Sequence, residues 1–197
     1  LTLSDNAAAD VVLEAVGVET VNTTMHDLGL SDTHVQHGTR QAQLQVQLDT
    51  GTRNLETSTH ALAALHREVT TAEYDPALSS RTTAQDMTRL LSLLWTGRIA
   101  SGPIGRLVRN AMTQQVWRHR LASGFPHDDV QVAGKTGTLG VLRHEVGVIT
   151  FPGEEPVAVA VFTRSARAET QLPTVDQAIG EAARVAVTRL RRARSDP

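Results

Sequence analysis

The last third of the chain changes its hydrophobic period, and this change limits the folds that are available. Three runs rich in valine, isoleucine and phenylalanine cover residues 130–136, 145–151 and 157–163. Between the second and third runs, residues 152–156 contain two prolines and a glycine, which predicts a hairpin turn. The three runs therefore predict a three-stranded antiparallel meander.

A long segment with an apolar stripe, residues 174–194, follows these runs and predicts a C-terminal helix. Its arginine-rich end suits the negative pole of a helix dipole, so we interpret it as a solvated end and not as a nucleic-acid contact. Helices, an antiparallel sheet and a covering C-terminal helix together make an α+β (mixed α/β) fold class. The expected inner face of the last helix consists of Val175, Ala178, Ile179, Ala182, Val185, Ala186 and Leu190.

The residues before the sheet are mostly helical in pattern. Ser4-Asp5-Asn6 supplies N-cap residues, and Thr82 or Thr83 caps the clearest helix, which Gly97 ends. Residues 31–80 are interpreted as an irregular surface excursion. The predicted helices cover residues 7–16, 19–28, 57–69, 84–96 and 103–112.

Two finer predictions concern apolar positions within these segments. Leu44, Val46 and Leu48 alternate as a short strand would. The helix that starts with Pro103 is expected to face inward with four apolar residues. These are Ile104, Leu107, Val108 and Met112.

Length and composition bound the class of protein. The 197 residues are enough for one domain with a sizeable core, so we expect a single domain over residues 1–197. A net charge of −2 gives no reason to expect nucleic acid as a partner, and no apolar run approaches the roughly 20 residues of a membrane span. The chain begins inside patterned sequence and shows no signal peptide, so we expect that an upstream portion is missing.

The only lysine of the chain lies in the run Val132-Ala133-Gly134-Lys135-Thr136-Gly137-Thr138. A strand that carries one ammonium group, hydroxyls and bare glycine backbone is suited to bind an anion closely. A phosphate-binding P-loop would need a glycine at position 129, which is Asp129, and a helix directly after Thr136. The nucleotide interpretation fails on both counts.

Two short motifs occur in a fixed order along the chain. Ser4-Asp5-Asn6 comes first, and Lys135-Thr136-Gly137 follows on a predicted strand. With the flanking stretches 4–10, 81–87 and 142–149, this order resembles the class A serine β-lactamase-like family of penicillin-recognising serine enzymes. The resemblance implies a β-lactamase/transpeptidase-like fold.

The resemblance also implies acyl-enzyme chemistry on a small-molecule β-lactam or a related carboxylated amide. Ser4 and Lys135 would be catalytic: the Ser4 hydroxyl would pass a proton to the leaving nitrogen, and Lys135 would attract the carboxylate and hydrogen-bond Ser4. Asn6 would hold the substrate's amide, and the backbone at Thr138 would donate to the oxyanion. The implied substrate-binding residues are Asn6, Thr136, Gly137, Thr138 and Arg143.

Two departures from the family pattern keep three hypotheses open. A Ser-x-x-Lys nucleophile motif is absent, because the only lysine is preceded three positions earlier by Val132. Residues 31–80 contain no Glu-x-x-x-Asn, the pattern that would activate a deacylating water, and Glu56, Glu68 and Glu73 fit helix faces equally well. The chain is therefore part of a hydrolase, part of a penicillin-binding or other amide- or ester-directed member without efficient deacylation, or a non-catalytic scaffold.

No cofactor or metal is expected. His34 and His37 form the nearest approach to a metal pair, and no third ligand is near them in the sequence. Trp95 and Trp117 are interpreted as core or rim packing and not as a recognition platform. The resemblance implies secretion or a periplasmic location, although this chain shows no signal peptide.

Overall fold

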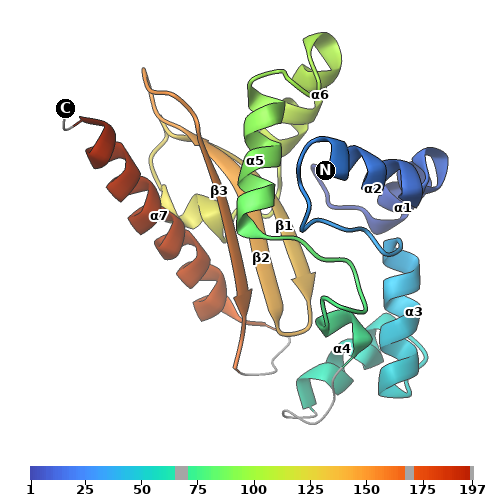
Figure 1. Cartoon of the computed structure of the whole chain (residues 1–197). Helices are drawn as coiled ribbons and strands as arrows, with labels where there is room; N and C mark the ends of the chain where they lie inside the picture. Colours follow the sequence, from blue (N-terminus) through green and yellow to red (C-terminus); the bar gives the residue numbers. More distant parts are fainter. Residues whose placement is uncertain (65–70, 167–170, 196–197) are drawn as a thin grey trace.

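The computed structural model describes residues 1–64, 71–166 and 171–195. In that part of the chain, helices precede a small sheet and one long helix follows it (Figure 1). The α-helices are α1 (Asn6–Val16), α2 (Val18–Asp27), α3 (Thr39–Thr50), α4 (Leu55–Ala64), α5 (Ala84–Trp95), α6 (Gly102–Thr113) and α7 (Pro173–Ser195). The short 3-10 helices are η1 (Ala72–Tyr74) and η2 (Leu121–Gly124), and the strands are β1 (Gln131–Leu139), β2 (Leu142–Thr150) and β3 (Val157–Arg164).

The sheet confirms the predicted meander, with antiparallel strands in the order β1-β2-β3. Strand β1 continues to Leu139, so the segment that carries the single lysine lies entirely on a strand. Its register sets Lys135 opposite Val146 and Thr138 opposite Arg143. Gly140 makes the tight turn into β2 with a φ of 50°. Within the described residues β1 is an edge strand, which leaves one side of it open.

Helices cover both faces of the sheet (Figure 1). On one face, Ile179 and Val187 of α7 pack with Val132 and Ile149 into a buried cluster. On the other face, the apolar stripe of α5 packs on a second cluster of small and branched residues. This second cluster contains Leu91, Leu94, Met112, Ala133 and Val148. Burial on both faces fixes the twist and register of β1, and with them the position of its polar end.

Helix α7 was predicted in the right place but with the wrong inner face. Of the predicted face only Ile179 is fully buried, and the buried stripe continues through Ala183 and Val187, while Val185 and Leu190 are both 42% exposed. The reason is a close backbone approach: a Cβ on Gly124 would lie 2.1 Å from the Gly180 carbonyl oxygen. This contact with η2 sets the rotation of α7. None of the helices in the described part of the chain combines the length and apolar character that crossing a bilayer requires.

Residues 31–80 are more regular than predicted. The proposed strand at Leu44, Val46 and Leu48 is wrong, because these residues belong to α3, where only Val46 is buried. Two features outweigh the apolar alternation. The Asp10 carboxylate, distant in the sequence, accepts the backbone N–H groups at the start of α3, and Gly51 ends the helix in a left-handed conformation. The predicted helix at 57–69 is observed as α4, and its residues 65–69, with the candidate carboxylate Glu68, lie outside the described residues.

Helix α6 also differs from its prediction. Met112 is buried and Val108 packs against the core, as expected, but Ile104 and Leu107 are each 69% exposed. Helix α1 shows a similar pattern, since none of its residues is buried and Val11 and Val12 are more than 60% exposed. These helices therefore present apolar side chains that the described residues do not cover.

Candidate functional site

A cavity of about 820 Å³ opens where the start of the chain meets the end of β1. Its lining comes from segments far apart in the sequence, including the residues before α1, the start of α3, the segment before η2 and the N-terminus of α7. All the site residues predicted from the sequence line this one cavity: Ser4, Asn6, Lys135, Thr136, Gly137, Thr138 and Arg143.

Ser4 is held in an unusual backbone conformation. Its φ of 58° is the only positive φ of a non-glycine residue among the described residues. The next residue, Asp5, caps α1 by accepting the Ala8 N–H at 2.7 Å, so the chain must turn sharply at Ser4 to enter the helix. A left-handed conformation is costly for an L-residue, and such strain is concentrated at functional sites.

The residues before Ser4 are anchored to the segment after α6. The Gln115 side chain donates to the Leu1 carbonyl at 3.0 Å, and the Val116 N–H donates to the Thr2 carbonyl at 3.2 Å. Gln115 itself is buried. The position of Ser4 is therefore fixed from both sides, by a helix cap after it and by these hydrogen bonds before it.

Lys135 reaches Ser4 directly. Its Nζ donates to Ser4 Oγ at 2.6 Å and to the Thr136 carbonyl at 2.6 Å. Burial lowers the pKa of Lys135 below its ordinary value; the Arg120 charge acts in the same direction, and the charge of Glu145 opposes it. An amine with a lowered pKa in contact with a hydroxyl can share a proton with it more readily than an exposed lysine can.

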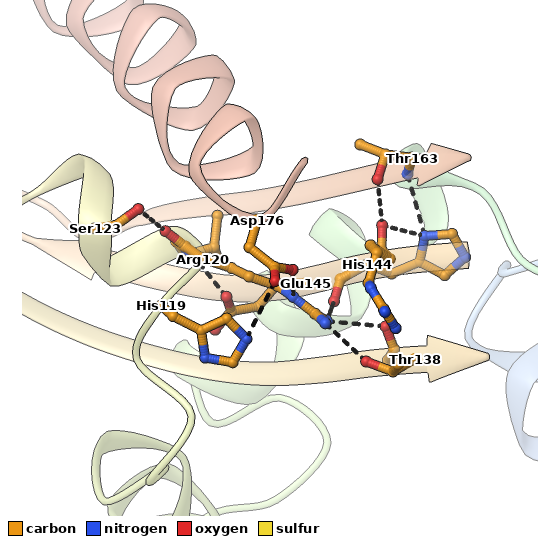
Figure 2. Close-up of polar contacts among 11 residues, drawn as sticks. His119, Arg120, Ser123, Thr138, His144, Glu145, Thr163 and Asp176 are labelled. Atoms are coloured by element: carbon orange, nitrogen blue, oxygen red, sulfur yellow. Dashed lines mark hydrogen bonds and ion pairs between the residues drawn. The ribbon is translucent and has the colours of Figure 1, made fainter. Parts of the chain in front are cut away.

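Arg120 is a site residue that the sequence analysis missed. It is 3% exposed, and its guanidinium donates to the carbonyls of Gly137 and His144, which face each other on β1 and β2, at 3.0 and 2.9 Å. It also donates to Thr138 Oγ1 at 2.8 Å (Figure 2). Arg120 thus fixes the cavity end of both strands and orients the Thr138 hydroxyl.

Asp176, in the first turn of α7, holds Arg120 in place. The Arg120 Nε donates to Asp176 Oδ1 at 2.6 Å, and His119 Nε2 lies 3.7 Å from the other carboxylate oxygen (Figure 2). No sequence signal separates Arg120 from the other arginines, because its role depends on the packing of η2 against α7. The covering helix therefore contributes to the site as well as to the core.

Arg143 and Asn6 complete the predicted set. Arg143 is 6% exposed, lies opposite Thr138 on β2, and has a pKa that burial lowers. Asn6 is the first residue of α1, and its carbonyl accepts the Thr39 hydroxyl at 3.2 Å. The Asp10 carboxylate accepts two hydrogen bonds from Thr39, one from the backbone N–H at 2.6 Å and one from the hydroxyl at 2.9 Å. These bonds bring the start of α3 to the cavity.

Carboxylates are scarce in the cavity. Among the described residues that line it, Asp176 is the only one, and it is paired with Arg120. Neither Glu56 nor Glu73 lines the cavity. The Glu73 carboxylate accepts the Ser79 hydroxyl at 2.5 Å and lies 3.1 Å from His37 Nε2. No group of three potential metal ligands occurs in the described ranges. The cavity therefore has three cations, Lys135, Arg120 and Arg143, and is suited to an anion.

The chain is similar to known proteins in sequence and in fold. A family model described as the beta-lactamase enzyme family matches residues 1–190. A curated relative, the beta-lactamase regulatory protein BlaB of Streptomyces cacaoi, is 32% identical over 208 residues, which cover 95% of this chain and 63% of the relative.

Two solved structures show the same fold at lower identity. A variant of the reconstructed class A β-lactamase of the last common ancestor of Gram-negative bacteria superposes with a TM-score of 0.74 at 22% identity, over 98% of this chain and 62% of that one. A mutant of PBP-A, solved as an acyl-enzyme complex with penicillin G, gives a TM-score of 0.68 at 18% identity, over 98% and 59%. The chain thus spans about three fifths of the length of these proteins.

Proposed function

The chain belongs to the beta-lactamase enzyme family, and from this premise we propose that its cavity binds β-lactams or related carboxylated amides and takes part in their acyl transfer. The observation that supports this best is the 2.6 Å hydrogen bond from Lys135 to Ser4 inside a cavity lined by three cations. The two residues come from motifs 131 positions apart, and the fold brings them together beside hydroxyl groups suited to a carboxylate.

In this proposal the carboxylate of the ligand binds at the end of β1. Lys135 supplies a point charge, the hydroxyls of Thr136 and Thr138 donate hydrogen bonds, and Arg143 adds a second charge. The Thr138 hydroxyl already accepts a hydrogen bond from Arg120, so its own proton is free to point toward the ligand. This arrangement places the ligand along the open edge of β1.

The proposed chemistry is an acyl transfer with a proton relay. A nucleophilic oxygen forms a bond to the lactam carbonyl carbon, and the bond from that carbon to nitrogen breaks. Ser4 donates its hydroxyl proton to the leaving nitrogen and recovers the proton of the nucleophile through the amine of Lys135, so protons balance. The contact with Lys135 stabilises the Ser4 oxygen while it is short of a proton.

We assign the nucleophile to a segment that these 197 residues do not contain. The same segment would cover the apolar side chains of α1 and α6, since Val11 and Val12 are 65% and 62% exposed and Ile104 and Leu107 are each 69% exposed. Exposed apolar surface of this extent usually marks an interface.

A substitution test on α1 addresses this assignment. In the full-length protein, the double substitution Val11→Asp and Val12→Asp should abolish acylation by benzylpenicillin, whereas Leu48→Asp, at a 76% exposed position of α3, should leave it unchanged. The double variant of the 197-residue chain should fold as well as the parent, because its valines are already exposed. Intact acylation in the double variant would refute the packing of the missing segment on α1.

A second candidate function is β-lactam binding with slow or no release of the acyl group. The specific support is the scarcity of carboxylates, because no unpaired carboxylate lines the cavity within the described residues to activate a deacylating water. The curated relative is named as a regulatory protein, which fits a ligand-responsive role. We propose this function over efficient hydrolysis.

One experiment separates the candidates. The full-length protein is mixed with nitrocefin and with benzylpenicillin, and turnover and intact mass are followed over the same period. A stable mass increase equal to one benzylpenicillin with little nitrocefin turnover is the expected result. Rapid turnover would favour the hydrolase, and binding without any adduct would favour a non-catalytic scaffold. The absence of both binding and adduct would refute the proposed function.

We further propose that residues 1–197 form part of a single catalytic domain and that the protein works outside the cytoplasm, secreted or periplasmic. Members of this family are typically exported, which supports the second point. Fractionation of cells that express the full-length gene would test it.

A further inference from the structure

The cavity has an apolar rim as well as a cationic wall. Trp117 and Leu3 line it together with the predicted site residues, and they are 49% and 68% exposed. A large aromatic side chain that remains half exposed at the mouth of an anion-binding cavity has apolar surface available to a ligand.

The indole ring of Trp117 is fixed before any ligand arrives. Its Nε1–H donates to the Leu3 carbonyl at 3.4 Å, and its backbone N–H donates to the Gln115 side chain at 3.2 Å. The ring also meets His119 edge-on, with centroids 6.2 Å apart and an interplanar angle of 89°. A preorganised surface of this kind loses little entropy when a ligand packs on it.

These contacts place the rim beside both chemical ends of the cavity. Leu3 directly precedes Ser4, and Trp117 is three residues before Arg120, which orients Thr138. Because Trp117 lines the same cavity as Lys135 and Thr138, a ligand whose carboxylate binds these two residues can also contact the indole.

We infer that Trp117 and Leu3 select among carboxylates, favouring those attached to a bulky apolar ring over small or polar ones. This inference rests on the proposed function, because it needs the carboxylate to bind at the end of β1. It adds the class of ligand: an anion with an apolar ring next to its carboxylate.

The test uses two probes that share a carboxylate and differ in the apolar group, acetate and benzoate. The ¹⁵N-labelled chain is titrated with each, and the amide signals of Gly137 and Thr138 report binding of the carboxylate. Contact with roughly 60 Å² of apolar surface predicts that benzoate binds about 10-fold more tightly than acetate. Benzoate should also shift the indole N–H signal of Trp117 and leave that of Trp95, which packs against the core, in place.

Three variants make the result specific. Trp117→Ala should reduce the benzoate preference to less than about threefold, with acetate affinity unchanged. Trp117→Phe should keep most of the preference, which separates a ring contact from loss of the hydrogen bond to Leu3. Val116→Ala, at a 52% exposed neighbour that does not line the cavity, should behave as the parent.

The outcomes separate a failure of the inferred ligand preference from a failure of the proposed carboxylate site. If both acids shift Gly137 and Thr138 but the preference survives Trp117→Ala, or the Trp117 indole signal does not move, the inference is wrong and the carboxylate site stands. If neither acid shifts those amides, the carboxylate site fails, and the inference fails with it.

Discussion

The Nζ atom of Lys135 lies 2.6 Å from the Oγ atom of Ser4, although 131 residues separate them in the sequence. Neither position is determined locally. Ser4 depends on a helix cap and on hydrogen bonds to residues after α6, and Lys135 depends on a strand buried on both faces. The whole fold is thus needed to bring one amine to one hydroxyl.

Loss of the Lys135 charge should weaken binding of a carboxylate. Hydrogen bonds to charged groups contribute about 1.5–3 kcal/mol, so Lys135→Gln should reduce the affinity of the chain for benzylpenicillin by about 10- to 100-fold. Isothermal titration calorimetry or the amide shifts of Gly137 would measure it. Arg98→Gln, which removes an exposed charge outside this cavity, is the matched control. An affinity within about twofold of the parent would mean that the carboxylate binds elsewhere.

The strained backbone at Ser4 predicts a difference between two substitutions. Ser4→Gly and Ser4→Ala both remove the hydroxyl, so each loses the hydrogen bond from Lys135. Only glycine adopts a φ of 58° without cost, and the glycine variant should have a free energy of unfolding about 1 kcal/mol higher than the alanine variant. Urea denaturation of the pair measures this difference. Equal stabilities would show that the backbone at Ser4 is not strained.

The sequence predicted those parts of the fold whose signals are local and periodic. The meander, α5 and α7 were all predicted this way, and Thr83, one of the two candidate caps, is the residue that caps α5. The predicted strand at 44–48 failed because Leu44 and Leu48, two of its three apolar residues, are exposed. The decisive signal, the Asp10 carboxylate, lies 29 residues from Thr39.

In the candidate site, too, some residues were predicted from local sequence motifs and others depend on long-range packing. Its two motifs were visible because their residue types and order are specific, and all seven predicted residues line one cavity. Arg120 and Asp176 were missed, since their pairing arises only when α7 packs against η2. The inner face of α7 was misjudged for the same reason, because a glycine contact and not hydrophobic periodicity sets its rotation.

Removal of Asp176 should destabilise the fold and disturb the site together. Its side chain is 14% exposed and that of Arg120 is 4% exposed, so Asp176→Ala leaves a buried charge without its carboxylate. Breaking such a pair costs about 3 kcal/mol, which urea denaturation would detect. The control is Glu181→Ala, which breaks an exposed pair with Arg184 and should leave the free energy of unfolding nearly unchanged. Similar costs for both variants would contradict a structural role for the Arg120 pair.

Glu145 should make stability depend on pH in a direction that is unusual for a carboxylate. It is 2% exposed and accepts the Leu121 N–H at 2.7 Å, and burial raises its pKa to about 7 from an ordinary value of 4.5, against the opposing effects of that hydrogen bond and of Arg120 and Lys135. The folded state therefore holds this proton more tightly than the unfolded state does. Its favourable contribution is complete below pH 4.5 and is lost as the pH rises through 7.

The variant Glu145→Gln isolates this contribution. Glutamine can still accept the Leu121 N–H, but it carries no charge to bury, so the variant should gain stability relative to the parent between about pH 5 and pH 8, by roughly 3 kcal/mol over the full titration. Urea denaturation of both proteins at several pH values gives the difference directly, and the other titrating groups cancel in it. A difference that stays constant with pH would show that Glu145 keeps an ordinary pKa. A difference of opposite slope would mean that the charges of Arg120 and Lys135 outweigh burial, and that Glu145 stays ionised beside the proposed carboxylate site.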